Sequence, residues 1–114
     1  MSHLLSAATR FVDVYHANHN LVAQQRGWTL AIGLVASDSG ATVLVQMDDG
    51  HVTQLREENS TADMVITADQ NTLCDILEFR RSPNEPYIFG ELTVRGPEAD
   101  FLRLDYIATT LCPL

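Results

Sequence analysis

Hydrophobic residues recur at helical spacing near the start of the chain and alternate with small or polar residues further along. From Leu4 to about Gln25 they return every three, four or seven positions, which predicts an amphipathic helix. Large and small residues alternate from Trp28 to Ala36, and Val43, Val45 and Met47 share one side of the stretch from Ala41 to Asp48. Alternation of this kind predicts two β-strands.

Asp49-Gly50 is the strongest hairpin signal in the chain, because a two-residue turn of the mirror type needs positive φ angles. It leads into a third predicted strand, His51 to Arg56. The polar run Glu57-Glu58-Asn59-Ser60-Thr61 is poor in β-formers and is expected to be a connection. The first half therefore predicts a helix followed by a three-stranded meander.

The second half predicts two further strands and two helices. A strand starts at Ala62, and Asp69 can cap a helix from Gln70 to Arg81, which ends before Pro83. The segment from Pro83 to Gly90 is expected to be a loop, and a strand follows from Glu91 to Arg95. Gly96-Pro97-Glu98 then starts the last helix, because proline is well tolerated in the first helical turn.

The stretch from Ala62 to Leu104 resembles the sterol carrier protein type 2 family of small lipid-binding domains. The fixed spacing of common residues carries this resemblance, whereas the first half resembles the family only in its order of elements. The matching positions are Ala62, Asp63, Asp69, Leu73, Ile76, Leu77, Arg80, Pro83, Tyr87, Gly90, Leu92, Val94 and Gly96.

The expected fold class is α+β, with a five-stranded, mainly antiparallel sheet covered on one face by about three helices. The resemblance further implies that the fourth strand lies beside the first as a parallel pair. A chain of 114 residues is long enough to bury a core of its own, so residues 1–114 are expected to form a single sterol-carrier-like lipid-binding domain.

The chain is acidic, with 15 Asp and Glu residues against seven basic ones and a net charge of -8. Such a charge repels phosphate backbones and anionic headgroups, so we expect no nucleic-acid partner and at most transient membrane contact. Cys74 and Cys112 have neither close metal-ligand spacing nor a secretory leader near them, which predicts reduced thiols in a cytoplasmic protein. Family members often end in a peroxisomal address, but Pro113 stands where that signal requires a basic residue.

The last helix is more apolar than one covered face requires, so it either roofs an apolar cavity or packs against a second subunit. The resemblance implies the cavity, with Ile88 and Phe89 beside its mouth, and with it the noncatalytic binding or transfer of a fatty acyl chain, acyl-CoA, sterol-like or isoprenoid lipid. The expected ligand-binding residues are Leu73, Ile76, Leu77, Ile88, Phe89, Phe101, Leu104, Ile107 and Leu111.

Two other functions stay open. The chain could be a homodimeric accessory module for a lipid or quinone pathway, or a small enzyme acting on a hydrophobic substrate. The chain departs from the family pattern at Glu91 and Pro86, and it stops soon after the last helix, so the cavity could be open, filled by a partner or collapsed. Tyr106, Arg80 and Arg103 are the candidate polar anchors for a ligand.

Candidate catalytic and metal-binding residues are sparse. Asp13, His16 and His19 drift around the first helix rather than sharing one face, which favours a solvated polar surface over a metal site. Cys74 lies beside Asp75, whose charge would blunt a thiol nucleophile. No enzymatic activity, metal or cofactor is therefore expected.

Overall fold

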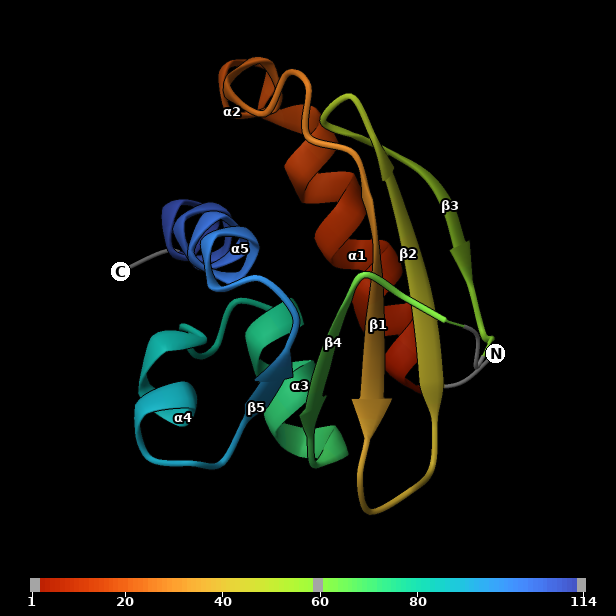
Figure 1. Cartoon of the computed structure of the whole chain (residues 1–114). Coiled ribbons are helices and arrows are strands. Elements are labelled where there is room, and N and C mark those ends of the chain that lie inside the picture. The colour runs from red at the N-terminus through yellow and green to blue at the C-terminus, as the bar shows by residue number, and fades with distance from the viewer. Residues whose placement is uncertain (1–2, 59–60, 113–114) are drawn as a thin grey trace.

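Five strands form one sheet in the spatial order β3-β2-β1-β4-β5 (Figure 1). The computed structural model describes residues 3–58 and 61–112. Asn59 and Ser60 of the predicted polar connection lie outside these ranges, as does Pro113, the residue at which the chain departs from a peroxisomal signal. The strands are β1 (Leu30–Ala36), β2 (Thr42–Asp48), β3 (His51–Arg56), β4 (Met64–Ala68) and β5 (Thr93–Arg95).

The strand pairing confirms the expected mixed sheet. β1 runs antiparallel to β2 and parallel to β4, with Ile32 opposite Met64 in the parallel pair, while β2–β3 and β4–β5 are antiparallel. Alternate residues of β1 are buried, from Leu30 to Ala36, and the same alternation continues in β4 from Met64 to Ala68. The large residues of both strands therefore share one covered face.

The hairpin between β2 and β3 has the backbone that its sequence predicts. Asp49 has a φ of 51° and Gly50 a φ of 83°, both in the left-handed region. A Cβ atom at Gly50 would lie 2.8 Å from the Gln25 carbonyl oxygen, so glycine is required here by close approach as well as by backbone angle. The Tyr15 hydroxyl donates to the Gly50 carbonyl and ties the first helix to this turn.

Within the described residues there are five helices rather than about three. They are α1 (His3–Ala17), α2 (His19–Gln24), α3 (Gln70–Leu77), α4 (Asn84–Ile88) and α5 (Glu98–Leu111). α1 and α3 pack against the sheet and against each other, and α5 also contacts α1, with α4 and α5 on the β5 side of the molecule (Figure 1). None of these helices is both long enough and apolar enough to cross a bilayer, a statement that covers the described residues alone.

The single helix predicted from Leu4 to about Gln25 is wrong, because the chain breaks at Asn18. This residue has a φ of -94° and a ψ of 86°, outside the helical region, and its Oδ1 accepts a hydrogen bond from the Leu21 amide at 3.1 Å. Asparagine competes well for this role, since its side chain satisfies an amide that the start of a helix leaves without a partner. The break lets α2 turn away as a separate short helix.

Two boundaries in the second half also differ from the prediction. α3 ends at Leu77 instead of Arg81, because Phe79 adopts a φ of 66° and the Arg80 amide donates back to the Asp75 carbonyl at 2.7 Å. This pattern is a Schellman helix end with phenylalanine at the position that glycine usually takes. The predicted loop from Pro83 to Gly90 instead contains the short helix α4.

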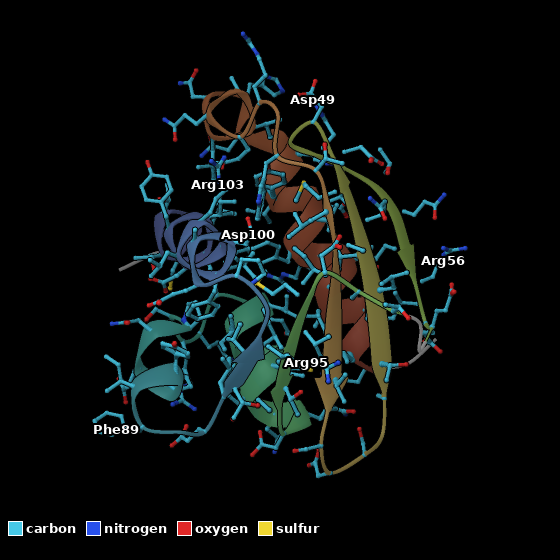
Figure 2. The ribbon with its side chains drawn as sticks, in the orientation of Figure 1. Asp49, Arg56, Phe89, Arg95, Asp100 and Arg103 are labelled. Carbon is cyan, nitrogen blue, oxygen red and sulfur yellow. The ribbon has the colours of Figure 1, made fainter. Side chains whose placement is uncertain are left out.

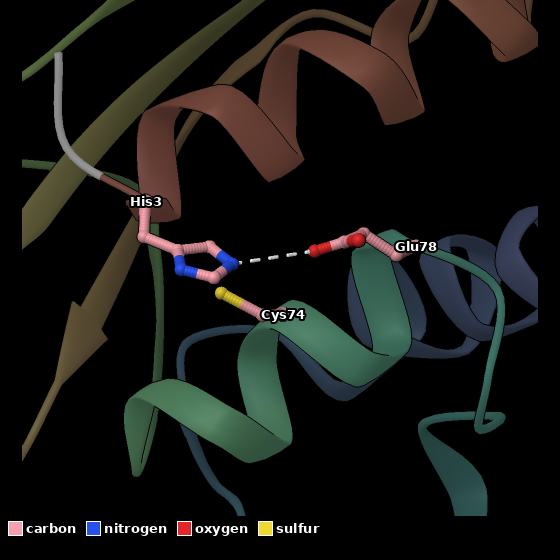
Figure 3. Close-up of side chains that lie close together, drawn as sticks. All are labelled: His3, Cys74 and Glu78. Carbon is pink, nitrogen blue, oxygen red and sulfur yellow. Dashed lines mark ion pairs between the residues drawn. The ribbon is translucent and has the colours of Figure 1, made fainter.

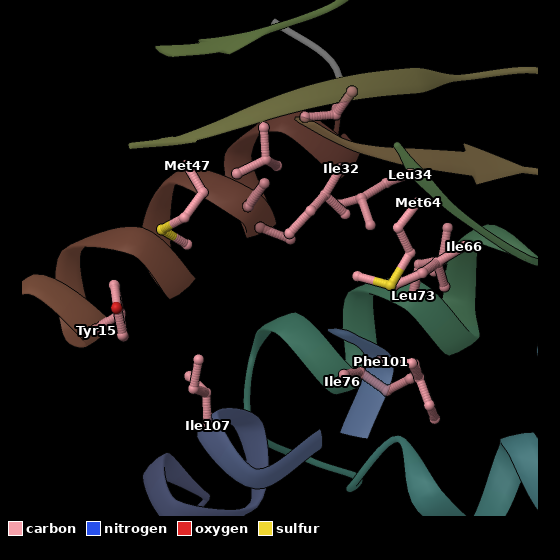
Figure 4. Close-up of a cluster of buried hydrophobic side chains, with 14 of the residues drawn as sticks. Tyr15, Ile32, Leu34, Met47, Met64, Ile66, Leu73, Ile76, Phe101 and Ile107 are labelled. Carbon is pink, nitrogen blue, oxygen red and sulfur yellow. The ribbon is translucent and has the colours of Figure 1, made fainter. Parts of the chain in front are cut away.

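The hydrophobic core fills the layer between the sheet and the helices. Side chains from β1, β2 and β4 point down onto those of α1, α3 and α5 (Figure 4). Several of the largest core members are almost completely inaccessible to solvent; these are Tyr15, Phe101, Leu4, Met64 and Ile107. The asparagine break and the early end of α3 leave this core intact.

Candidate functional site

An apolar cavity of about 70 Å³ lies inside the core, between the sheet and helices α1, α3 and α5. Phe11 and Tyr15 of α1 form one wall, and the buried faces of β1 and β2 form another. Phe101 of α5 closes it from the side of α4, where its ring packs on Tyr87 with the ring centroids 4.6 Å apart. Apolar side chains from the sheet and from three helices thus line one partly open space.

The structure brings six of the nine expected ligand-binding residues to this cavity. Three come from α3 and three from α5; they are Leu73, Ile76, Leu77, Phe101, Leu104 and Ile107. Their convergence follows from helical spacing on two helices that face the same strands. Their role as ligand contacts stays a prediction.

The other three expected residues do not line the cavity. Ile88 is 65% exposed and Phe89 is 74% exposed at the end of α4, where Phe89 points away from the core (Figure 2). Leu111, in the last turn of α5, lies at a shallow surface depression together with Val14 and Asn18. These three residues could contact a ligand only at the mouth of the cavity, or a partner only at a protein interface, because they are not part of the cavity wall.

Sequence reasoning missed the wall that α1 contributes. Ala8, Phe11 and Tyr15 belong to the apolar side of the helix predicted from Leu4, and they line the cavity together with Val12. Helical periodicity signals that such residues are buried but not whether they meet packed atoms or an empty space. Ala108 of α5 also lines the cavity, and its side chain is a single methyl group.

Tyr15 supplies the only hydroxyl, charge or amide among the side chains that line the cavity in the described part of the chain. Its hydroxyl is already engaged with the Gly50 carbonyl. Burial raises the pKa of Tyr15, an effect that the charge of Arg103 partly offsets, so the phenol is neutral at physiological pH. The cavity therefore offers a ligand hydrophobic contact and almost no polar contact.

None of the three candidate polar anchors lines the cavity. The Arg80 guanidinium pairs with Asp75 at 2.8 Å on the surface of α3. Arg103, near the start of α5 in Figure 2, donates to the Gln25 amide oxygen at 3.0 Å and lies over the Trp28 ring. The Tyr106 hydroxyl is 3.2 Å from the Gln24 amide oxygen. Arg103 and Tyr106 tie α5 to the segment before β1.

The first-helix residues considered for a metal site occupy another part of the molecule. His16 Nε2 accepts a hydrogen bond from the Val52 amide at 3.1 Å, and His16 and His19 line an open surface cleft with His51. Burial, and to a smaller extent the charge of His51, lower the pKa of His16, while Asp13 opposes them. In residues 3–58 and 61–112, the group whose ligand atoms lie close enough to share an ion consists of His3, Cys74 and Glu78.

The fold and the cavity together define an α+β protein with helices over a mixed sheet and an apolar cavity between them. The sequence matches no protein-family model and no curated protein. Solved structures do match over nearly the whole chain. A crystal structure of sterol carrier protein 2 has a TM-score of 0.69 and 18% identity, covering 96% of this chain and 95% of its own.

Two further structures show the same arrangement of elements. Palmitated SCP2L2 from Aedes aegypti has a TM-score of 0.70 and 15% identity, with 95% of both chains covered. The UbiJ-SCP2 ubiquinone synthesis protein has a TM-score of 0.64 and 16% identity, covering 93% of this chain and 85% of its own. This chain has the sterol carrier protein 2 fold, which confirms the α+β class and the resemblance of its second half.

Proposed function

We propose that this protein binds an apolar ligand in the cavity and carries it without chemical change. The observation that supports the proposal is the cavity itself, which is lined by aliphatic and aromatic side chains and by a single engaged hydroxyl. Binding sites for apolar molecules are concave, mainly hydrophobic and sparse in polar groups. A catalytic site would need an acid, base or nucleophile at the cavity, and the described lining residues supply only the neutral Tyr15 phenol.

Hydrophobic burial alone supplies most of the free energy that such a carrier needs. Each buried methylene contributes about 0.8 kcal/mol, so eight carbons of a fatty acyl chain contribute about 6 kcal/mol before ordering costs. Micromolar affinity corresponds to about 8 kcal/mol. A long chain, or a compact sterol-like or isoprenoid molecule, therefore reaches useful affinity with one weak polar contact or none.

The ligand must also enlarge the space that it enters. A cavity of about 70 Å³ is roughly half the volume of an engineered cavity that accommodates benzene. The helix best able to move is α5, because only Phe101, Ile107 and Ala108 of its fourteen residues are buried. Outward displacement of α5 would open the space toward α4 and bring Ile88 and Phe89 to the rim, the place proposed for them as ligand contacts.

The proposed ligand class is a fatty acyl chain, an acyl-CoA, a sterol-like molecule or an isoprenoid lipid. One structural neighbour is described as palmitated, which supports the acyl chain as the first ligand to test. We further propose that the chain works as a single domain in the cytoplasm and that its contact with membranes is transient. The net charge of -8 supports this last point, because anionic headgroups would be repelled.

Displacement of a fluorescent fatty acid by palmitate is the direct test. Leu77→Asp places a carboxylate at a half-buried position of the cavity wall, whereas Leu102→Asp makes the same change at a position of α5 that is 54% exposed and outside the wall. The first variant should lose at least tenfold in affinity, since a charge would have to be buried against the ligand, and the second should bind as the native protein does. Equal affinity in two folded variants would contradict the proposed site.

A second candidate function is a homodimeric accessory module for a lipid or quinone pathway. It is favoured by large apolar side chains left exposed on the neighbouring helices α4 and α5; these are Tyr87, Ile88, Phe89, Leu102 and Tyr106. The likeness to a ubiquinone synthesis protein supports the same direction. Native mass spectra of the sample used for the displacement assay distinguish the two functions: a monomer with copurified lipid supports the carrier, and a ligand-free dimer supports the module.

A further inference from the structure

A histidine, a cysteine and a glutamate meet where the first turn of α1 crosses α3. His3 begins α1 and reaches over the C-terminal half of α3, where Cys74 and the C-cap residue Glu78 lie four positions apart (Figure 3). Their ligand atoms, the imidazole nitrogen, the thiol sulfur and a carboxylate oxygen, all lie within 4.8 Å of one another. The site is separate from the cavity, because none of the three residues lines it.

The distance between His3 and Glu78 suits two ligands of one ion better than it suits a direct hydrogen bond. His3 Nε2 lies 3.6 Å from Glu78 Oε1, beyond the range of about 2.7–3.2 Å for an N–H···O hydrogen bond. Two such atoms at about 2.1 Å from a tetrahedral zinc ion stand about 3.4 Å apart, and a thiolate ligand stands about 3.6 Å from either of them. Small side-chain adjustments would bring all three ligand atoms to these separations.

The surroundings hold the carboxylate in position and leave the right oxygen available. Arg80 Nη1 donates to Glu78 Oε2 at 3.2 Å, so the opposite oxygen, Oε1, faces His3. The same guanidinium also pairs with Asp75 at 2.8 Å. With Cys74 as a thiolate, this group carries three negative charges and one positive charge, a balance that a divalent cation neutralises.

Access and softness of the ligands favour zinc among the divalent ions. The His3 side chain is 66% exposed, which gives an ion a path from solvent, while the Cys74 thiol is buried beneath it. Burial and the nearby Glu78 charge raise the pKa of Cys74, so in the metal-free protein the thiol keeps its proton. Thiolate and imidazole ligands select zinc over magnesium or calcium, which prefer all-oxygen sites.

We propose that His3, Cys74 and Glu78 form a zinc site with water in the fourth position. Binding releases the Cys74 thiol proton to solvent as the sulfur–zinc bond forms, with no change of oxidation state. The ion would join the start of α1 to the middle of α3, and both helices supply walls of the apolar cavity through Phe11 and Leu73. Zinc would therefore stabilise the helical layer from outside the cavity.

Titration of the untagged, reduced protein with Co²⁺, followed by competition with Zn²⁺, tests the proposal. A thiolate ligand gives cobalt a charge-transfer absorption, which we expect at one equivalent and which Zn²⁺ should remove. Cys74→Ser should abolish this absorption. His3→Gln and Glu78→Gln should each weaken Co²⁺ binding by at least tenfold, because loss of a ligand costs no less than loss of a group that orients one.

Two variants serve as matched controls. Cys112→Ser replaces the other cysteine and His19→Gln removes an exposed histidine at a distant cleft, and both should bind Co²⁺ as the native protein does. The proposal is overturned if the native protein gives no thiolate absorption, if the absorption survives in Cys74→Ser, or if His3→Gln and Glu78→Gln bind with unchanged affinity. Circular dichroism of each variant shows whether a loss reflects the site or the fold.

Discussion

Ala108 offers a substitution whose effects on stability and on ligand binding should have opposite signs. Its side chain is 3% exposed and lines the cavity from α5. Replacement by valine adds two carbon atoms on the side of the helix that faces the empty space. A packing defect would be repaired by this change, and a ligand site would be obstructed by it.

The expected gain in stability is about 1 kcal/mol. Two buried carbons contribute about 1.6 kcal/mol, from which the lower helix propensity of valine subtracts up to about 0.7 kcal/mol. In a domain of this size such a gain raises the melting temperature by about 4 °C. The ligand loses room for about the same two carbons, and its affinity should fall by roughly tenfold.

Thermal unfolding and fatty-acid displacement on one pair of variants provide the test. Ala99→Val makes the same chemical change at an exposed position in the first turn of α5, so it should lower the melting temperature slightly and leave binding unchanged. The reasoning is refuted if Ala108→Val melts below Ala99→Val, which would mean that valine overpacks this wall. It is refuted equally if Ala108→Val is stabilised but binds fatty acid as tightly as the native protein.

Two further predictions concern single polar side chains. Asp69 Oδ1 accepts a hydrogen bond from the Thr72 amide at 2.7 Å. A hydrogen bond with the Thr72 side chain and, after it, the one from the Thr72 amide hold the pKa of Asp69 below its usual 3.8. The stabilisation from these bonds is therefore present at neutral pH and lost as the pH falls through that lowered pKa. Asp69→Ala should cost about 1 kcal/mol in denaturant unfolding at pH 7 and Asp69→Asn much less, and equal losses would exclude capping as the cause. The pKa of His16 is lowered, so the unfolded chain binds its proton first and native stability should decrease as the pH falls from about 6.5. His16→Gln should flatten the stability curve between pH 7 and 5, and an unchanged slope would assign that dependence to other groups.

The strands and turns could be predicted because their signals are local. Alternation marked the covered face of β1, and Asp49-Gly50 specified its turn through backbone angles that few other residue pairs tolerate. The order β3-β2-β1-β4-β5 could not be derived from alternation, and the parallel β1–β4 pair was expected only from the resemblance. Pairing across a long connection leaves no signal in either strand alone.

The helix boundaries and the α1 wall of the cavity escaped prediction for different reasons. Asn18 fits the apolar period of α1 as a polar position, and only its cap to Leu21 reveals that the helix ends there. Phe79 takes a left-handed angle that favours glycine, and its ring stacks on Phe11 at 5.5 Å, a tertiary contact that accompanies the unusual backbone. The cavity wall on α1 arises because the side chains of α1, the sheet and the other helices leave a gap where they meet. Such a gap depends on tertiary packing and leaves no signal in the sequence of one helix.

The central position of β1 has a consequence for how the chain acquires its structure. β1 meets β2 across a short turn, whereas its other neighbour, β4, arrives after β3 and the connection that follows it. Closing a short loop costs less chain entropy than closing a long one. Amide hydrogens shared by β1 and β2 should thus become protected from solvent exchange earlier during refolding than those shared by β1 and β4, which makes docking of the carboxy-terminal half the late step.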